Sequence, residues 1–341
     1  MGMTSRELVY RTMEFRNRDG RAPREMWALP WAWSRYGDEL RRLQEEFPSD
    51  TTGVGANKRQ PKTEGNPYAV GTYVDPWGCR FVNNHEGVHG EVKEPIVALE
   101  DENWDDTSAV NFPYEWLEVD VDSANAQCRQ TDRFVGAGAC PRPFEQLQFM
   151  RTSEQLFVDL AFMPSGLRSF MSRMHTFYCD VLEAWAKTEV DALSFMDDWG
   201  SQNALLINPE LWRKIFKPMY KDYIDIAHRA GKKATMHSDG HILSIYPDLV
   251  ELGLDSINSQ IFCMGVENLK PFAGRICFNG EVDRQELLSF ASVEDVRKAV
   301  RSVHEHLWKD GGCFAQCEFS AGNRPENVRA VYETWAEVLP G

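Results

Sequence analysis

From about residue 131 onwards, short apolar segments alternate with longer amphipathic ones, and this alternation constrains the fold more than any other feature. Strands are predicted at 133–139, 192–196, 233–237, 256–260, 276–280 and 313–318, and helices at 153–162, 166–187, 209–230, 242–252, 293–308 and 325–338. Strands that alternate with helices pair in parallel through right-handed crossovers. With an early strand at 26–30, the pattern predicts an α/β fold, a (β/α)8 TIM barrel whose second strand has no clear counterpart in the sequence.

The first 130 residues lack this regularity. Short helices are predicted at 5–15 and 38–47, and residues 51–67, rich in Gly, Asn, Lys and Thr, predict a loop. Aromatic and β-branched residues on both sides of Pro-Trp-Gly predict a β-hairpin over 71–83. No linker divides the chain. We therefore expect one domain over 1–341, with N-terminal elaborations and the first strand in 1–130 and regular β/α units in 131–341.

The charge balance argues against nucleic acid as a partner. The sequence has 37 basic and 52 acidic residues, a net charge of -15, whereas binding nucleic acid requires a basic face. Residues 1–24 are charged and lack the apolar segment of a secretory signal, and no apolar run is long enough to span a bilayer. We expect a cytoplasmic protein, with no membrane partner, whose eight cysteines are thiols or metal ligands rather than disulfides.

Reactive side chains follow nearly every predicted strand. In TIM barrels the residues at the carboxyl ends of the strands form the active site, so these side chains are expected to share one cavity. We expect one carboxylate of the pair that follows 192–196 to orient the site and the other to face it. The side chains at the strand ends are Asp197, Asp198, His237, Asp239, Gln260, Glu281, Asp283, Cys317 and Glu318.

Five motifs in order resemble the uroporphyrinogen decarboxylase-like superfamily. They are YVDPWG at 73–78, DDWGSQ at 197–202, HSDG at 237–240, FNGEVD at 278–283 and PENVRA at 325–330. The hairpin motif is similar to that of the zinc- and corrinoid-dependent methyltransferase branch. In true uroporphyrinogen decarboxylases an N-terminal arginine pair holds the substrate, and the matching segment PWAWSRY at 30–36 keeps only the second arginine.

The resemblance implies a zinc site. The methyltransferase branch holds zinc with a His-x-Cys at one strand end and a cysteine near the last strand. By motif these positions are His237, Asp239 in place of the middle cysteine, and Cys317, all residue types that zinc accepts. A fourth ligand could be Asp198, Glu281, Cys277 or the substrate. The corrinoid is expected on a partner protein, because the chain has no Asp-x-His-x-x-Gly segment.

Two roles for the zinc stay open. It could activate a thiol that accepts a methyl group, or polarise a methoxy or methylamine donor, which the harder carboxylate ligand favours. We expect Asp198, Asp239 and Glu281 to be catalytic. Substrate contacts are expected from Trp33, Arg35, Tyr36, Asp75, Gln202 and Gln260. Asp75 could instead be an ordinary turn residue, and Cys317 could be a small buried side chain without a role in metal binding.

Two other functions compete with methyl transfer. One is a metal-free decarboxylase that acts on a polycarboxylate, for which Arg35, Tyr36 and Asp75 would matter more than Cys317. The other is a non-catalytic ligand-binding subunit of a methyl-transfer complex, suggested by the missing middle cysteine. The resemblance also makes a homodimer plausible.

Overall fold

The strands form a parallel, TIM-barrel-like arrangement, described for residues 2–340 in a computed structural model. Six strands pair in the order β10-β9-β8-β7-β6-β2, and β1 pairs with β11. A parallel bridge from Phe278 to Cys313 connects β10 to the start of β11, and Asp50 N donates to Arg24 O between β2 and β1. The strands are β1 (Arg24–Ala28), β2 (Thr51–Gly53), β6 (Phe134–Gly136), β7 (Ala192–Met196), β8 (Lys233–Ser238), β9 (Ser256–Ser259), β10 (Cys277–Phe278) and β11 (Ala315–Phe319).

Strand β2 is the strand that sequence patterns did not locate, and the prediction of a loop from residue 51 is wrong at its start. Only Thr51–Gly53 pair with β6, too few residues for a periodic pattern. The strand is held by the buried Asp50, which accepts hydrogen bonds from Ser5 Oγ at 2.5 Å and Arg21 Nη1 at 2.6 Å. The hydrogen bonds of this buried carboxylate therefore connect the N-terminal helix to the first two barrel strands.

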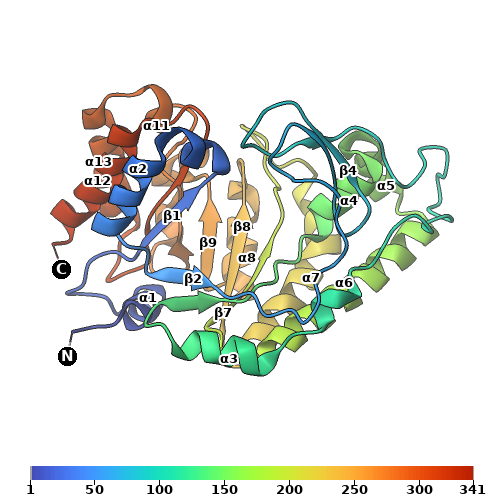
Figure 1. The fold of residues 1–341 in the computed structure, drawn as a ribbon, viewed down its shortest axis with the longest axis horizontal. Coiled ribbons are helices and arrows are strands. Elements are labelled where there is room, and N and C mark those ends of the chain that lie inside the picture. The colour runs from blue at the N-terminus through green and yellow to red at the C-terminus, as the bar shows by residue number, and fades with distance from the viewer. Residues whose placement is uncertain (1, 341) are drawn as a thin grey trace.

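The helices surround the strands, with α2, α12 and α13 on one side and α6 and α7 on another (Figure 1). Most predicted helices agree with the structure, and 153–162 and 325–338 agree to the residue. Helix α2 starts eight residues before the prediction, because Pro30 occupies its first turn, where proline is favoured. The α-helices are α1 (Ser5–Met13), α2 (Pro30–Glu46), α3 (Val121–Arg129), α4 (Pro143–Arg151), α5 (Ser153–Phe162), α6 (Ser165–Ala186), α7 (Pro209–Arg229), α8 (Tyr246–Leu252), α9 (Ile261–Met264), α10 (Val266–Leu269), α11 (Leu287–Phe290), α12 (Val293–Leu307) and α13 (Pro325–Val338), and the 3-10 helices are η1 (Tyr114–Leu117), η2 (Leu243–Ile245) and η3 (Lys270–Phe272).

A small antiparallel sheet lies outside the barrel. Strands β3 (Gly71–Val74) and β4 (Arg80–Asn83) pair as a hairpin, and β5 (Glu91–Val92) pairs with β4. The turn closes where Asp75 Oδ1 accepts from Cys79 N at 2.7 Å, the role of a turn residue. Phe81 packs on Phe149 of α4 with ring centroids 5.0 Å apart, so the sheet contacts the elements that follow β6. Over the residues described, no helix is long and apolar enough to cross a membrane.

Candidate functional site

A large cavity occupies the barrel and extends to the hairpin. Its volume is about 1220 Å³, enough for a sizeable ligand. TIM barrels usually fill this space with bulky branched side chains, but here the strands contribute the short polar residues Thr51, Ser194, Thr235 and Ser256. Aromatic side chains line much of the remaining wall: Trp27, Tyr73, Trp77, Phe81, Trp116, Phe149, Tyr178 and Phe195.

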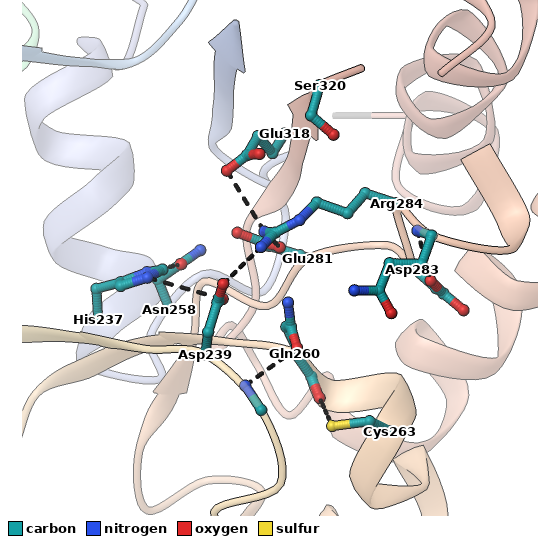
Figure 2. Close-up of polar contacts among 12 residues, drawn as sticks. His237, Asp239, Asn258, Gln260, Cys263, Glu281, Asp283, Arg284, Glu318 and Ser320 are labelled. Carbon is teal, nitrogen blue, oxygen red and sulfur yellow. Dashed lines mark hydrogen bonds and ion pairs between the residues drawn. The ribbon is translucent and has the colours of Figure 1, made fainter. Parts of the chain in front are cut away.

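Three of the predicted side chains meet at one edge of this cavity. His237 Nε2 lies 3.4 Å from Asp198 Oδ1 and 3.7 Å from Asp239 Oδ1. One ligand atom from each residue lies within 4.8 Å of the others, close enough to share a metal ion. His237 and Asp239 are two apart at the end of β8 and point to the same side (Figure 2). We call these three residues the His–Asp cluster.

The tautomer of His237 follows from its neighbour on β9. Asn258 Nδ2 donates to Asn279 O at 2.5 Å, so Asn258 Oδ1 faces His237 Nδ1 at 2.6 Å and accepts its proton. Nε2 is therefore directed at the two carboxylates. Burial alone would lower the pKa of His237, but the ion pair with Asp198 and the charges of Asp239 and Glu281 outweigh burial and raise this pKa to about 9. Nε2 is thus suited to hold a proton or a metal ion.

The loops that carry Asp198 and Asp239 are joined through their backbones. Gly200 N donates to Asp239 O at 3.0 Å, and His241 N donates to Ser201 O at 2.8 Å. Gly200 and Gly240 pack directly against each other, and a Cβ atom at either position would overlap the backbone of the other. Gly240 also has φ +77°, which favours glycine. The glycine pair therefore fixes the separation of the two carboxylates.

Arg284 lies behind the cluster, where it contacts three acidic side chains (Figure 2). Its guanidinium donates to Asp239 Oδ2 and to Glu281 Oε2 at 2.5 Å each, and Nη1 lies 3.4 Å from Glu318 Oε2. Burial and the charges of Asp239 and Glu318 raise the pKa of Glu281 to about 7, because together they exceed the lowering effect of the Arg284 charge. Asp239 Oδ1 is buried, and no hydrogen-bond partner for it occurs in residues 2–340. Arg284 thus holds one oxygen of Asp239 and leaves the other facing His237.

The two adjacent aspartates have separate roles, as predicted. Asp197 is fully buried and accepts hydrogen bonds from Glu145 N at 2.7 Å and Tyr220 Oη at 2.5 Å. It therefore anchors the start of α4, and burial raises its pKa well above the usual range. Asp198 faces the cavity beside His237. The orienting carboxylate is Asp197, and Asp198 belongs to the site.

Comparison with known families identifies the chain. The family described as uroporphyrinogen decarboxylase (URO-D) matches residues 82–338, three quarters of the sequence. The chain belongs to the uroporphyrinogen decarboxylase family. This confirms the resemblance seen in the sequence motifs.

One solved structure of full coverage shares the fold of this URO-D family member. A methyltransferase from Methanosarcina mazei matches it with a TM-score of 0.68 and 12% identity over 99% of both chains. At that identity the likeness shows a common fold. A B12-independent methionine synthase from Shewanella sp. W3-18-1 matches 65% of this chain and 67% of its own with a TM-score of 0.41 and 12% identity. No curated protein matches the sequence.

The metal ligand predicted at Cys317 is wrong. This residue is 0% exposed, and its Sγ lies 3.3 Å from Tyr332 Oη of α13, on the outer face of β11. Successive residues of a strand point to opposite faces, so Glu318, which lines the cavity, takes the inward position. The expected centre of His237, Asp239 and Cys317 is not formed, and Asp198 takes the place of the cysteine in the cluster.

Several predicted substrate contacts also lie elsewhere in this URO-D family member. Trp33, Arg35 and Tyr36 lie on α2, and none of the three lines the cavity. Arg35 is exposed and lies over the ring of Tyr36, 5.8 Å from its centroid, so it is no carboxylate clamp of this cavity. Tyr36 stacks instead on Phe319 at the end of β11, with ring centroids 5.6 Å apart.

Gln202 and Gln260 line a separate small pocket of about 110 Å³ on the far side of Glu281 and Arg284. Gln260 Oε1 accepts from Gly240 N at 3.0 Å, which positions the loop after Asp239 rather than a substrate. Asp75 does line the main cavity. Trp27, which lies in the predicted strand 26–30, also lines the cavity. The sequence did not indicate the cavity residues Glu25, Arg142, Glu145 and Arg284, none of which lies in a predicted strand.

Proposed function

We propose that this chain is a metal-dependent methyltransferase that moves a methyl group between a small molecule and a corrinoid carried by a partner protein. The observation that carries the proposal is the convergence of Asp198, His237 and Asp239 at the edge of a 1220 Å³ cavity. Membership in the URO-D family and the methyltransferase-like fold support it. A zinc ion is the leading candidate for the metal.

The donor set fits a divalent cation. One imidazole nitrogen and two carboxylate oxygens are ligands that zinc accepts, and three protein ligands leave a position open. The buried Asp239 Oδ1, for which residues 2–340 provide no hydrogen bond, is oriented to serve as one ligand. Bound there, the cation would act as a Lewis acid on an oxygen or nitrogen of the ligand in the cavity. Without a thiolate the set is hard, which favours a methoxy or methylamine donor over a thiol acceptor.

The chain's own residues orient this site. Asn258 accepts the Nδ1 proton of His237 and so keeps Nε2 directed at the carboxylates. Arg284 binds Asp239 Oδ2 and neutralises part of the negative charge contributed by Glu281 and Glu318. The aromatic wall formed by the hairpin and its neighbours offers an apolar surface to a bound small molecule. These residues hold the reacting groups in fixed positions, which is a large part of catalysis.

Decarboxylation of a polycarboxylate is the alternative that the cavity's two arginines favour. Five acidic side chains, Glu25, Asp75, Glu145, Asp198 and Glu318, line the same cavity, against Arg142, Arg284 and His237, whose pKa of about 9 keeps it charged at neutral pH. Arg284 is already paired with carboxylates. A ligand with several negative charges would be repelled by this excess, so the charge distribution supports methyl transfer. A purely ligand-binding role is excluded if turnover rises above background.

The test is methyl transfer to cob(I)alamin, followed by its absorbance, from a panel of methoxy and methylamine donors. We expect turnover with one donor class, about one zinc per chain by elemental analysis, and loss of both in His237→Ala. Cys317→Ala is the matched control and should retain metal and activity, because its sulfur faces α13. Folded protein that takes up no metal and transfers no methyl group contradicts the proposal. Uroporphyrinogen consumption by the same protein would favour decarboxylation.

A further inference from the structure

Trp27 lies in the cavity between two carboxylates. Glu25 and Trp27 are two apart on β1, so both side chains point into the barrel. Glu318 is the register partner of Trp27 on β11 and also lines the cavity. The Trp27 ring lies 5.5 Å from the ring of His237, between centroids. An indole next to two carboxylates therefore stands beside the His–Asp cluster.

The negative charge of Glu25 is hydrogen-bonded but not neutralised. Thr51 Oγ1 donates to Glu25 Oε1 at 2.6 Å and Asn279 Nδ2 donates to Oε2, and both donors are uncharged. Within residues 2–340 no Lys, Arg or His forms an ion pair with Glu25, and no Arg or Lys lies over the Trp27 ring. The charge of Glu25 is thus left unneutralised by the residues described, and the indole beside it packs against the ring of His237.

A buried polar side chain without a partner among the residues described lies next to Glu25 in the barrel wall. Gln316 is the register partner of Glu25 and lies on the same face of β11 as Glu318. It is 0% exposed, and neither atom of its amide has a hydrogen-bond partner among the residues described. Buried polar groups in proteins are nearly always hydrogen-bonded. The amide is absent from the cavity lining, so it adds an uncharged polar neighbour to Glu25 rather than a contact of the ligand.

We propose that Glu25, Trp27 and Glu318 bind a methylated ammonium group. The face of an indole attracts a cation, and quaternary ammonium ligands are recognised in this way. The carboxylate of Glu25 and that of Glu318, which Arg284 contacts at 3.4 Å, add the opposite charge, and acidic residues outnumber basic ones in the cavity lining. As a statement about the substrate, this inference rests on the proposed methyltransferase function and names the methylated ammonium compounds as its class. Because an ammonium nitrogen has no lone pair, a metal ion in the His–Asp cluster would act on another oxygen or nitrogen of such a substrate. As a statement about binding, it stands without that function.

The test compares choline with 3,3-dimethyl-1-butanol, which has the same shape with carbon in place of the charged nitrogen. Binding of both is measured by calorimetry on metal-free wild-type protein. We expect choline to bind more tightly by roughly tenfold to thirtyfold, the range given by a desolvated cation–π contact. Equal binding of the two compounds, or no binding of either, overturns the proposal.

Variants assign the preference to these residues. Glu25→Gln is expected to weaken choline by about tenfold and to change the neutral compound by less than about twofold, since it removes only charge. The matched control is Glu91→Gln, which removes one exposed carboxylate outside the cavity and should alter neither. If Glu25→Gln does not fold, Trp27→Leu should reduce the preference for choline. An undiminished preference in the folded variant overturns the assignment.

Turnover separates this inference from the proposed function. Preferential binding of choline without methyl transfer from any donor supports the ammonium site and contradicts the methyltransferase. Methyl transfer from a neutral methoxy donor, with no preference for choline in binding, supports the methyltransferase and overturns the ammonium site.

Discussion

Substitution of Asp239 should abolish the response to metal, whereas substitution of Cys317 should leave it unchanged. Both residues were expected ligands, but Cys317 Sγ contacts Tyr332 on the outer face of β11, and Asp239 Oδ1 faces His237. A cation that binds only the folded state stabilises it by about 2.7 kcal/mol at one hundred times its Kd. An unfolding entropy of about 2.1 cal/mol/K per residue over 341 residues makes this a rise of roughly 4 °C in Tm.

The assay is the Tm of metal-free protein with and without saturating zinc, by differential scanning fluorimetry. Wild type and Cys317→Ala should both gain roughly 4 °C, although the alanine variant starts lower because it loses about 1 kcal/mol of buried packing. Asp239→Asn loses its ion pair with Arg284, so it should start below wild type, and it should gain little with zinc, since the amide is a poor ligand. A full gain in Asp239→Asn, or none in Cys317→Ala, would refute the assignment of the cluster.

Two further predictions concern pH and the glycine pair. Burial and the nearby charge of Asp198 raise the pKa of Glu145 from 4.5 to about 7, because together they exceed the opposing effect of the Arg142 charge. Between pH 4.5 and 7 the folded state therefore binds one more proton than the unfolded state, and its stability falls as pH rises through this interval. Glu145→Gln should reduce this decline by up to about 3 kcal/mol in urea melts of metal-free protein at pH 5 and 8, and an unchanged decline would contradict the shift. Gly200→Ala, whose Cβ would overlap Gly240 and His241, should cost about 1–3 kcal/mol and abolish the zinc-dependent rise in Tm. Its control Gly55→Ala has open space for a Cβ and should retain the rise.

The sequence predicted the barrel and the strand ends, because alternating strands and helices of this length have few other solutions. Strand 192–196 and the cluster at 197–198 and 237–239 follow from that pattern. The prediction of Cys317 as a metal ligand was wrong because the sequence did not show which residues of β11 face into the barrel. Glu318 and Gln316 alternate with Cys317, and only one of the two sets can face inward. The motif match assigned a role to Cys317 but gave no information on the face.

Other residues of the site could not be predicted because no local pattern specifies them. Arg284 lies in a loop after β10, and its position is set by three carboxylates from different segments. Strand β2 depends on the buried Asp50 and on its partner β6 rather than on its own three residues. Long-range contacts of this kind become visible only when the chain is folded.

The direct packing of Gly200 on Gly240 separates the scaffold from the chemistry of the ligands. The two loops are registered by backbone hydrogen bonds and by the absence of side chains, so their spacing does not depend on which side chain stands at residue 239. A thiolate could replace the carboxylate there without a rearrangement of either loop. Such an architecture lets a lineage exchange hard donors for soft ones, and so change which metals and substrates it uses, one substitution at a time.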